Sequence, residues 1–199
     1  VDLETGRRRM LAEGLSPTVS PDGTRLAFLL QGTQGRAPDV ILVTALVVLD
    51  LRTGRSRSFP LRPAPPRGTP PGLIVNWSPD GRRIVLFDGA RIRLVRLANA
   101  GAVTSQPVAP ASKGSRSPVF LDAGTLVVLD GCCIGPQQLT AITLATRARR
   151  PFATLPAPTE SLQRVGPGVL LAVTADQRLL LVTKGGVRSI ATGIVAATS

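Results

Sequence analysis

The tetrapeptide Ser-Pro-Asp-Gly occurs twice in this chain, 58 residues apart, and each copy precedes a charged residue and a short apolar run. The two apolar runs are Leu-Ala-Phe-Leu at 26–29 and Ile-Val-Leu-Phe at 84–87. Self-similarity over a long interval is the mark of a repeat architecture. The repeat therefore restricts the fold more strongly than any single residue does.

The chemistry of the tetrapeptide is that of a tight turn between two strands. Proline presets φ at the first central position, aspartate tolerates the second, and glycine supplies the positive φ needed where the chain enters the next strand. This structural role accounts for both aspartates without a catalytic function. The expected turn residues are Ser20, Pro21, Asp22, Gly23, Ser78, Pro79, Asp80 and Gly81.

A second repeat runs in phase with the first. The segment Asp-Leu-Glu-Thr-Gly-Arg at 2–7 matches Asp-Leu-Arg-Thr-Gly-Arg at 50–55, where Gly54 is the expected turn glycine. Weaker copies place the equivalent leucines at positions 3, 51, 97 and 144, in steps of 48, 46 and 47 residues. The repeat therefore marks units of about this length, each with a second hairpin.

Strands rather than helices fill these units. Short runs of Val, Leu and Ile lie between Gly, Pro, Asp and Ser, and 18 prolines leave little room for long helices. One short helix is expected at 157–164. Four antiparallel strands in a period of 40 to 50 residues predict an all-β chain folded as a β-propeller. A β-sandwich is the alternative fold, but the recurring turn argues against it.

The predicted blades span residues 15–61, 73–108, 117–155 and 162–193, and residues 1–11 would end a preceding blade. We treat 1–199 as one partial propeller of about four to five blades, expected to be a fragment of a six-bladed ring. The chain begins without methionine and inside a repeat, which points to a fragment or a processed product. The longest apolar run, at 40–49, is too short to cross a bilayer.

The amino-acid composition limits the kinds of catalytic and metal site that this chain can form. The sequence has no histidine, which removes histidine-based triads and metal sites. Adjacent cysteines rarely pair with each other, and no second cluster is present to complete a metal site with Cys132 and Cys133. We therefore expect no cofactor, no metal and no catalytic residue in this chain.

The net charge of +12 leaves two interpretations open. Scattered arginines can be solvated edge charges that oppose aggregation, or they can attract an anionic partner. Aromatic residues make up only 3% of the chain, so a base-stacking surface is poorly supported and no specific nucleic acid is expected.

The segment Trp-Ser-Pro-Asp-Gly-Arg-Arg-Ile-Val-Leu at 77–86, followed by a strand and a turn of the Asp-Leu-x-Thr-Gly type, resembles the WD-like repeat of TolB-type β-propellers. The segment at 19–28 matches it without the tryptophan, and the match fades beyond residue 108. The resemblance implies a propeller, commonly six-bladed, that binds proteins in the bacterial cell envelope. It also implies an alternative, because similar repeats form the propeller domain of prolyl-oligopeptidase-like peptidases.

Strand order assigns the turns to two ends of such a propeller. Tight Ser-Pro-Asp-Gly and Thr-Gly turns share one end, and the longer connections, at 31–39, 60–72, 109–116, 131–138 and 156–163, share the other. Irregular loops on a rigid scaffold are where binding residues concentrate. The candidate binding residues are therefore Arg36, Asp39, Arg62, Arg67, Arg116, Cys132, Cys133 and Gln137.

From these observations the chain is expected to be a non-catalytic scaffold whose partner is another protein, with an acidic surface that suits the loop arginines. The resemblance implies a periplasmic or other extracytoplasmic location. The alternative function is the propeller domain of a peptidase whose hydrolase domain lies outside this chain. Such a domain would carry a Gly-x-Ser-x-Gly motif, which is absent here.

Overall fold

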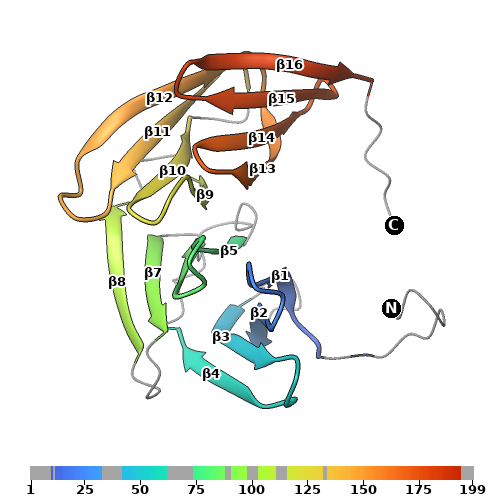
Figure 1. Cartoon of the computed structure of the whole chain (residues 1–199), viewed down its shortest axis with the longest axis vertical. Coiled ribbons are helices and arrows are strands. Elements are labelled where there is room, and N and C mark those ends of the chain that lie inside the picture. The colour runs from blue at the N-terminus through green and yellow to red at the C-terminus, as the bar shows by residue number, and fades with distance from the viewer. Residues whose placement is uncertain are drawn as a thin grey trace.

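The computed structural model describes residues 10, 12–32, 42–61, 74–87, 91–97, 103–110, 116–131 and 134–193. Sixteen strands form four separate four-stranded antiparallel sheets, and each sheet uses four consecutive strands in sequence order. This arrangement of four successive blades confirms the predicted all-β propeller (Figure 1). No helix is present in the described part of the chain, and none there could span a membrane.

The strands of the first two blades follow the sequence repeat closely. Blade 1 comprises β1 (Leu15–Val19), β2 (Arg25–Gly32), β3 (Leu42–Asp50) and β4 (Ser56–Pro60). Blade 2 comprises β5 (Ile74–Trp77), β6 (Arg83–Phe87), β7 (Arg91–Leu97) and β8 (Val103–Pro110). The apolar runs at 26–29 and 84–87 lie within the second strands of these blades, β2 and β6.

The last two blades lack the tetrapeptide but keep the architecture. Blade 3 comprises β9 (Arg116–Phe120), β10 (Thr125–Asp130), β11 (Gln137–Thr143) and β12 (Arg149–Leu155). Blade 4 comprises β13 (Thr159–Gly166), β14 (Val169–Thr174), β15 (Arg178–Thr183) and β16 (Gly186–Thr192).

The predicted helix at 157–164 is wrong, because most of that segment belongs to β13. Glu160, Leu162 and Gln163 suit a helix by propensity, but β13 pairs with β14 along its length and buries Leu162 against the blade 3 core. Tertiary pairing overrides the local preference. The connection expected at 156–163 is correspondingly shorter, since β13 begins at Thr159.

Consecutive blades pack face to face through apolar side chains. Ala27 and Leu29 of blade 1 share a buried cluster with Ile84 and Leu86 of blade 2. Similar clusters join blade 2 to blade 3 and blade 3 to blade 4. Alternate residues of each middle strand point to opposite faces, so every interior blade contributes to two clusters.

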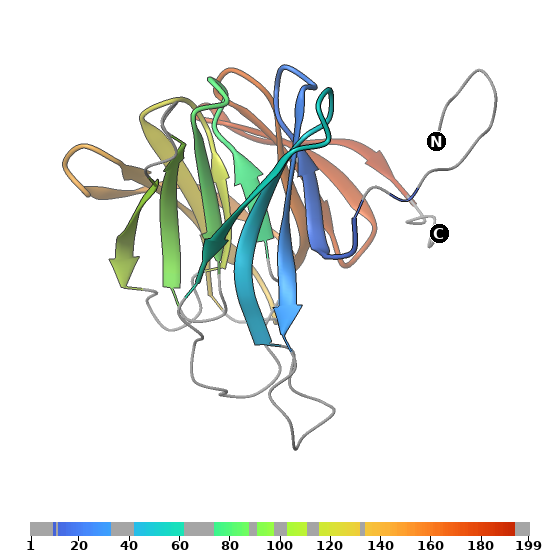
Figure 2. The same ribbon diagram turned by 90° about the horizontal axis from the view of Figure 1, so that it is seen from below.

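The first strand of each blade lies innermost and the fourth lies at the rim (Figure 1). Contacts run from β1 to β5, from β5 to β9 and from β9 to β13, which orders the blades around an arc. The turns after first and third strands gather at one end of the molecule, here named the tight-turn end (Figure 2). The opposite end, where second and fourth strands finish, is named the loop end. The segment 1–11 lies outside the described residues except for Met10.

Candidate functional site

Most residues proposed to bind a partner lie outside the described part of the chain. These are Arg36, Asp39, Arg62, Arg67, Cys132 and Cys133. Arg116 is the first residue of β9, which starts at the loop end. That the proposed binding residues lie close to one another therefore stays a prediction.

Gln137 is the proposed binding residue whose surroundings are defined. It begins β11 and is fully buried. Its Oε1 accepts a hydrogen bond of 2.9 Å from the backbone N–H of Thr159, the first residue of blade 4. This contact links blade 3 to blade 4 at the loop end, so the side chain is part of the joint between them.

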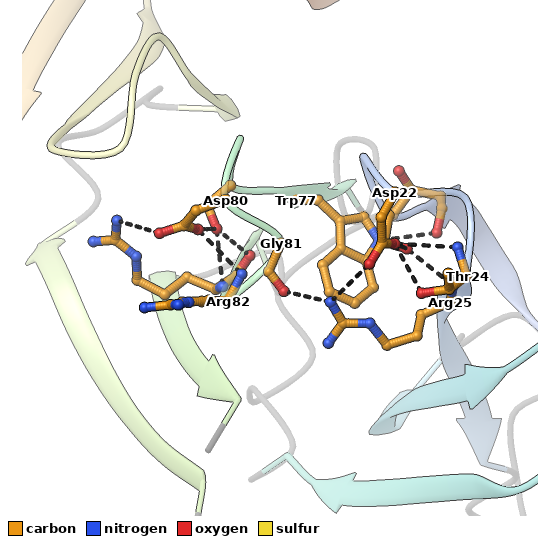
Figure 3. A network of polar contacts seen from close by, with 11 residues as sticks. Asp22, Thr24, Arg25, Trp77, Asp80, Gly81 and Arg82 are labelled. Atoms are coloured by element: carbon orange, nitrogen blue, oxygen red, sulfur yellow. Dashed lines mark hydrogen bonds and ion pairs between the residues drawn. The ribbon is translucent and has the colours of Figure 1, made fainter. Parts of the chain in front are cut away.

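The Ser-Pro-Asp-Gly turn of blade 1 is locked by its own side chains (Figure 3). The Gly23 N–H donates to the Ser20 carbonyl at 2.9 Å, and Gly23 has a φ of 70°, as the turn chemistry predicted. The Asp22 carboxylate accepts from the Ser20 hydroxyl at 2.5 Å and from the Thr24 N–H at 3.1 Å. The Ser20 hydroxyl also accepts from the Arg25 N–H at 2.9 Å, which fixes the first residue of β2.

Blade 2 repeats this arrangement residue by residue. The Ser78 hydroxyl donates to Asp80 at 2.5 Å and accepts from the Arg83 N–H at 2.9 Å. Gly81 has a φ of 64° and donates its N–H to the Ser78 carbonyl. The tetrapeptide therefore encodes a side-chain network as well as a backbone turn.

These hydrogen bonds also fix the ionisation of the two aspartates. Donation by the Ser20 hydroxyl, followed by the Thr24 N–H and hydroxyl, lowers the pKa of Asp22 to about 2. At Asp80 burial opposes ionisation, but donation by Ser78 and by the Arg82 N–H, together with the positive charges of Arg83 and Arg82, outweighs it and lowers the pKa. Carboxylates that stay ionised at neutral pH are poor proton donors, so neither group is suited to general acid catalysis.

An arginine from each turn reaches the neighbouring blade. The Arg25 guanidinium donates to the Gly81 carbonyl at 2.8 Å and lies 4.9 Å from the centre of the Trp77 ring (Figure 3). The Trp77 indole N–H returns the contact by donating to the Thr18 carbonyl at 3.0 Å. We call this arrangement the arginine clasp. It joins the tight turns of blades 1 and 2 by hydrogen bonds in both directions.

The next joint uses a second arginine clasp. Arg83 donates to the Ala123 carbonyl in the first turn of blade 3 and lies 5.8 Å from the centre of the Phe120 ring. At the joint between blades 3 and 4 the direction reverses, because Arg164 of blade 4 donates to the Leu121 carbonyl of blade 3 at 3.3 Å. At each of the three described joints of the tight-turn end, an arginine therefore donates a hydrogen bond to a carbonyl of the neighbouring blade.

Sequence reasoning missed the clasp, although its signal was present. The arginine occupies the same place in both copies, two residues after the glycine of the tetrapeptide. The aromatic partner precedes the next turn, as Trp77 in blade 2 and Phe120 in blade 3. The pairing becomes visible only when each turn is placed beside the turn of the following blade.

Among the described residues, no three aspartate, glutamate, cysteine or histidine side chains lie close enough together to hold a metal ion. The carboxylates of the tight turns are dispersed over blades 1 to 3, where each one accepts hydrogen bonds from its own turn. The described geometry therefore offers joints between blades and a scaffold for loops, and does not bring reactive groups together.

The fold and these joints define a β-propeller, and comparison with known proteins agrees. No protein-family model and no curated protein sequence matches the chain. The structure is similar to an oligogalacturonate lyase solved with manganese, with a TM-score of 0.67 and 16% identity over 100% of this chain and 60% of that one. It is also similar to TolB from Acinetobacter baumannii, with a TM-score of 0.60 and 16% identity over 92% of this chain and 45% of that one.

A third similar structure is that of prolyl endopeptidases, with a TM-score of 0.58 and 14% identity over 97% of this chain and 32% of that one. The chain thus spans between about a third and 60% of the length of these proteins. At such identities the likeness concerns the fold, and it confirms the expected resemblance to TolB-like propellers at that level.

Proposed function

We propose that this chain is a propeller scaffold that binds another protein through the loop end. The tetrapeptide turns and the two clasp arginines support this, because hydrogen bonds within and between the blades already engage their polar groups. The buried clusters between the blades fix the strands from which the longer connections extend. A scaffold of this kind presents its variable segments at one end and stabilises itself at the other.

The charge of the loop segments suggests the kind of partner. In the sequence, Arg36 lies in the connection after β2, Arg62 and Arg67 lie in the connection after β4, and Arg116 begins β9. Arginines of this kind favour an acidic protein surface, by steering its approach and by pairing with its carboxylates. The similarity to TolB supports a cell-envelope protein as the class of partner and a location outside the cytoplasm.

Site-specific photo-crosslinking in the source cells tests the proposal. A photoreactive residue in place of Arg67 should give a discrete protein adduct, and one in place of Arg147 at the tight-turn end should not. The paired reversal Arg36→Glu and Arg62→Glu, made in the protein that carries the photoreactive residue at position 67, should then reduce the adduct while leaving the urea unfolding midpoint unchanged. The matched reversal Arg147→Glu and Arg150→Glu controls for net charge. An adduct of equal yield in both reversed proteins would overturn the electropositive loop end.

A second function is favoured by how little of some relatives the chain covers. It matches 32% of the prolyl endopeptidase chain and 24% of the tricorn protease chain, so propellers of this shape occur within larger peptidases. On this alternative, the chain is the propeller domain of a peptidase. Peptidase activity of the full-length gene product, lost on mutating the serine of a flanking Gly-x-Ser-x-Gly motif, would favour it over the scaffold.

A further inference from the structure

The tight-turn end carries many exposed basic side chains. They come from the turn between third and fourth strands, or from strand residues next to it, in all four blades, and from the first turn of blade 2. Within the described residues none of them forms an ion pair. The set, here named the basic rim, is Arg52, Arg55, Arg57, Arg82, Arg96, Arg147, Arg150, Lys184 and Arg188.

The carboxylates at the same end accept hydrogen bonds from their own turns. Asp50 accepts from the N–H groups of Arg52 and Thr53 at 3.0 and 2.7 Å, and Asp122 accepts from the Gly124 N–H at 2.7 Å. Asp22 and Asp80 are held in the same way by the tetrapeptide networks. The acidic groups are therefore occupied locally, whereas the basic rim extends into solvent.

Exposed aliphatic side chains lie at this end as well. Val19, the last residue of β1, and Val165, near the end of β13, are each 54% exposed. Leu51, in the turn after β3, is 37% exposed. Three of the six large apolar residues found exposed in the described chain thus accompany the basic rim.

The basic rim is distributed over all four blades. The described turns after first and third strands finish at one end of the propeller, as Figure 2 shows, and the basic side chains belong to these turns or to the strand residues next to them. A partner that engages charges from all four blades at once must itself be extended. Anionic lipid headgroups provide such a surface, and exposed aliphatic residues can enter the boundary between headgroups and acyl chains.

We propose that the tight-turn end docks reversibly onto an anionic lipid surface. Nucleic acid fits the observations less well, because the described aromatic side chains are buried or half-buried and cannot stack on bases. Docking by the tight-turn end would point the loop end away from the lipid. The inference is therefore independent of the proposed protein-binding function, and each can fail without the other.

Vesicle co-sedimentation tests the docking surface. The protein should bind vesicles of phosphatidylcholine mixed with phosphatidylglycerol, should not bind phosphatidylcholine alone, and should be released by salt. Each neutralised arginine should weaken binding roughly fivefold, so the triple variant Arg52→Gln, Arg55→Gln and Arg57→Gln should bind about a hundredfold more weakly. Leu51→Ser should weaken binding a few-fold and retain the salt dependence.

The control carries the same change of charge in the connections that follow β2 and β4, through Arg36→Gln, Arg62→Gln and Arg67→Gln. This variant should keep most of its affinity for the anionic vesicles. Equal losses in the two triple variants would show a response to net charge alone and would overturn the docking surface. Absence of binding to the anionic vesicles would also overturn it, as would binding to duplex DNA that the anionic vesicles fail to displace.

Discussion

Blades 3 and 4 have the same four-stranded construction, but their sheets are buried to different degrees. On β10, Val127 and Leu129 are fully buried against blade 4. On β14, Leu171 and Val173 occupy the corresponding face of the next blade and are only half-buried. A propeller sheet is therefore stabilised by what covers its two faces as much as by its own strand pairing. Stability in this chain should be highest at the interior joints and lower on the outer face of blade 4.

The largest expected effect is at the interior face. Leu129→Ala should lower the free energy of unfolding by about 3 kcal/mol, because the side chain is fully buried and its removal leaves a cavity. The matched variant Leu171→Ala should cost only about 1 kcal/mol, since solvent already reaches that leucine. Urea unfolding of the two variants measures the difference. Equal losses would mean that the outer face of blade 4 is as tightly packed as the joint.

The two turn glycines give a second matched pair. Both have positive φ, so alanine is strained at either position by about 1 kcal/mol. A Cβ on Gly81 would also lie 3.0 Å from Arg25 Nη2, whereas one on Gly23 would meet nothing within 4 Å. Gly81→Ala should therefore cost about 2 kcal/mol and Gly23→Ala about 1 kcal/mol. Thermal unfolding of both variants checks the order, and a reversed order would contradict the arginine clasp.

The clasp itself should show as coupling between its two side chains. In a double-mutant cycle, Arg25→Ala and Trp77→Leu should be coupled by about 1 kcal/mol, because the guanidinium lies against the indole ring. The cycle of Arg83 and Phe120 should give a smaller value, because the guanidinium is farther from the ring and phenylalanine is the weaker partner. If the two losses of stability at the first joint are additive, the contact between the guanidinium and the indole ring does not stabilise the clasp.

The smallest effect is expected from pH. The folded-state pKa of Asp22 is about 2, below its ordinary value of 3.8, so its ionised form favours the folded state. That contribution is complete above about pH 4 and is lost as the pH falls through about 2. Asp22→Asn should flatten the loss of stability in this interval, measured by urea unfolding at a series of pH values. An unchanged acid slope would show that the turn network does not favour the charged carboxylate.

The sequence predicted the parts of the fold that depend on local chemistry. The tetrapeptides predicted two turns with positive φ at Gly23 and Gly81, and the apolar runs at 26–29 and 84–87 lie within β2 and β6. It failed at β13, where residues with good helix propensity are held in a strand by pairing with β14. Pairing with β14 determines the conformation of this segment, and helix propensity carries no information about such pairing.

The candidate site was predictable only in outline. Strand order assigned the connections to two ends, but Gln137 proved to be a buried joint residue and the arginine clasps were not anticipated. Both depend on which residues of neighbouring blades face each other. A single sequence indicates the repeat but not the register between successive copies.

The most direct test of partner binding at the loop end is amide hydrogen exchange of the chain with and without the protein captured at position 67. Binding at the loop end predicts added protection in peptides that cover 33–41 and 62–73, with no change in the tight turns at 20–24 and 78–82. Protection confined to the tight turns would place the protein partner at the opposite end and would contradict the proposed function.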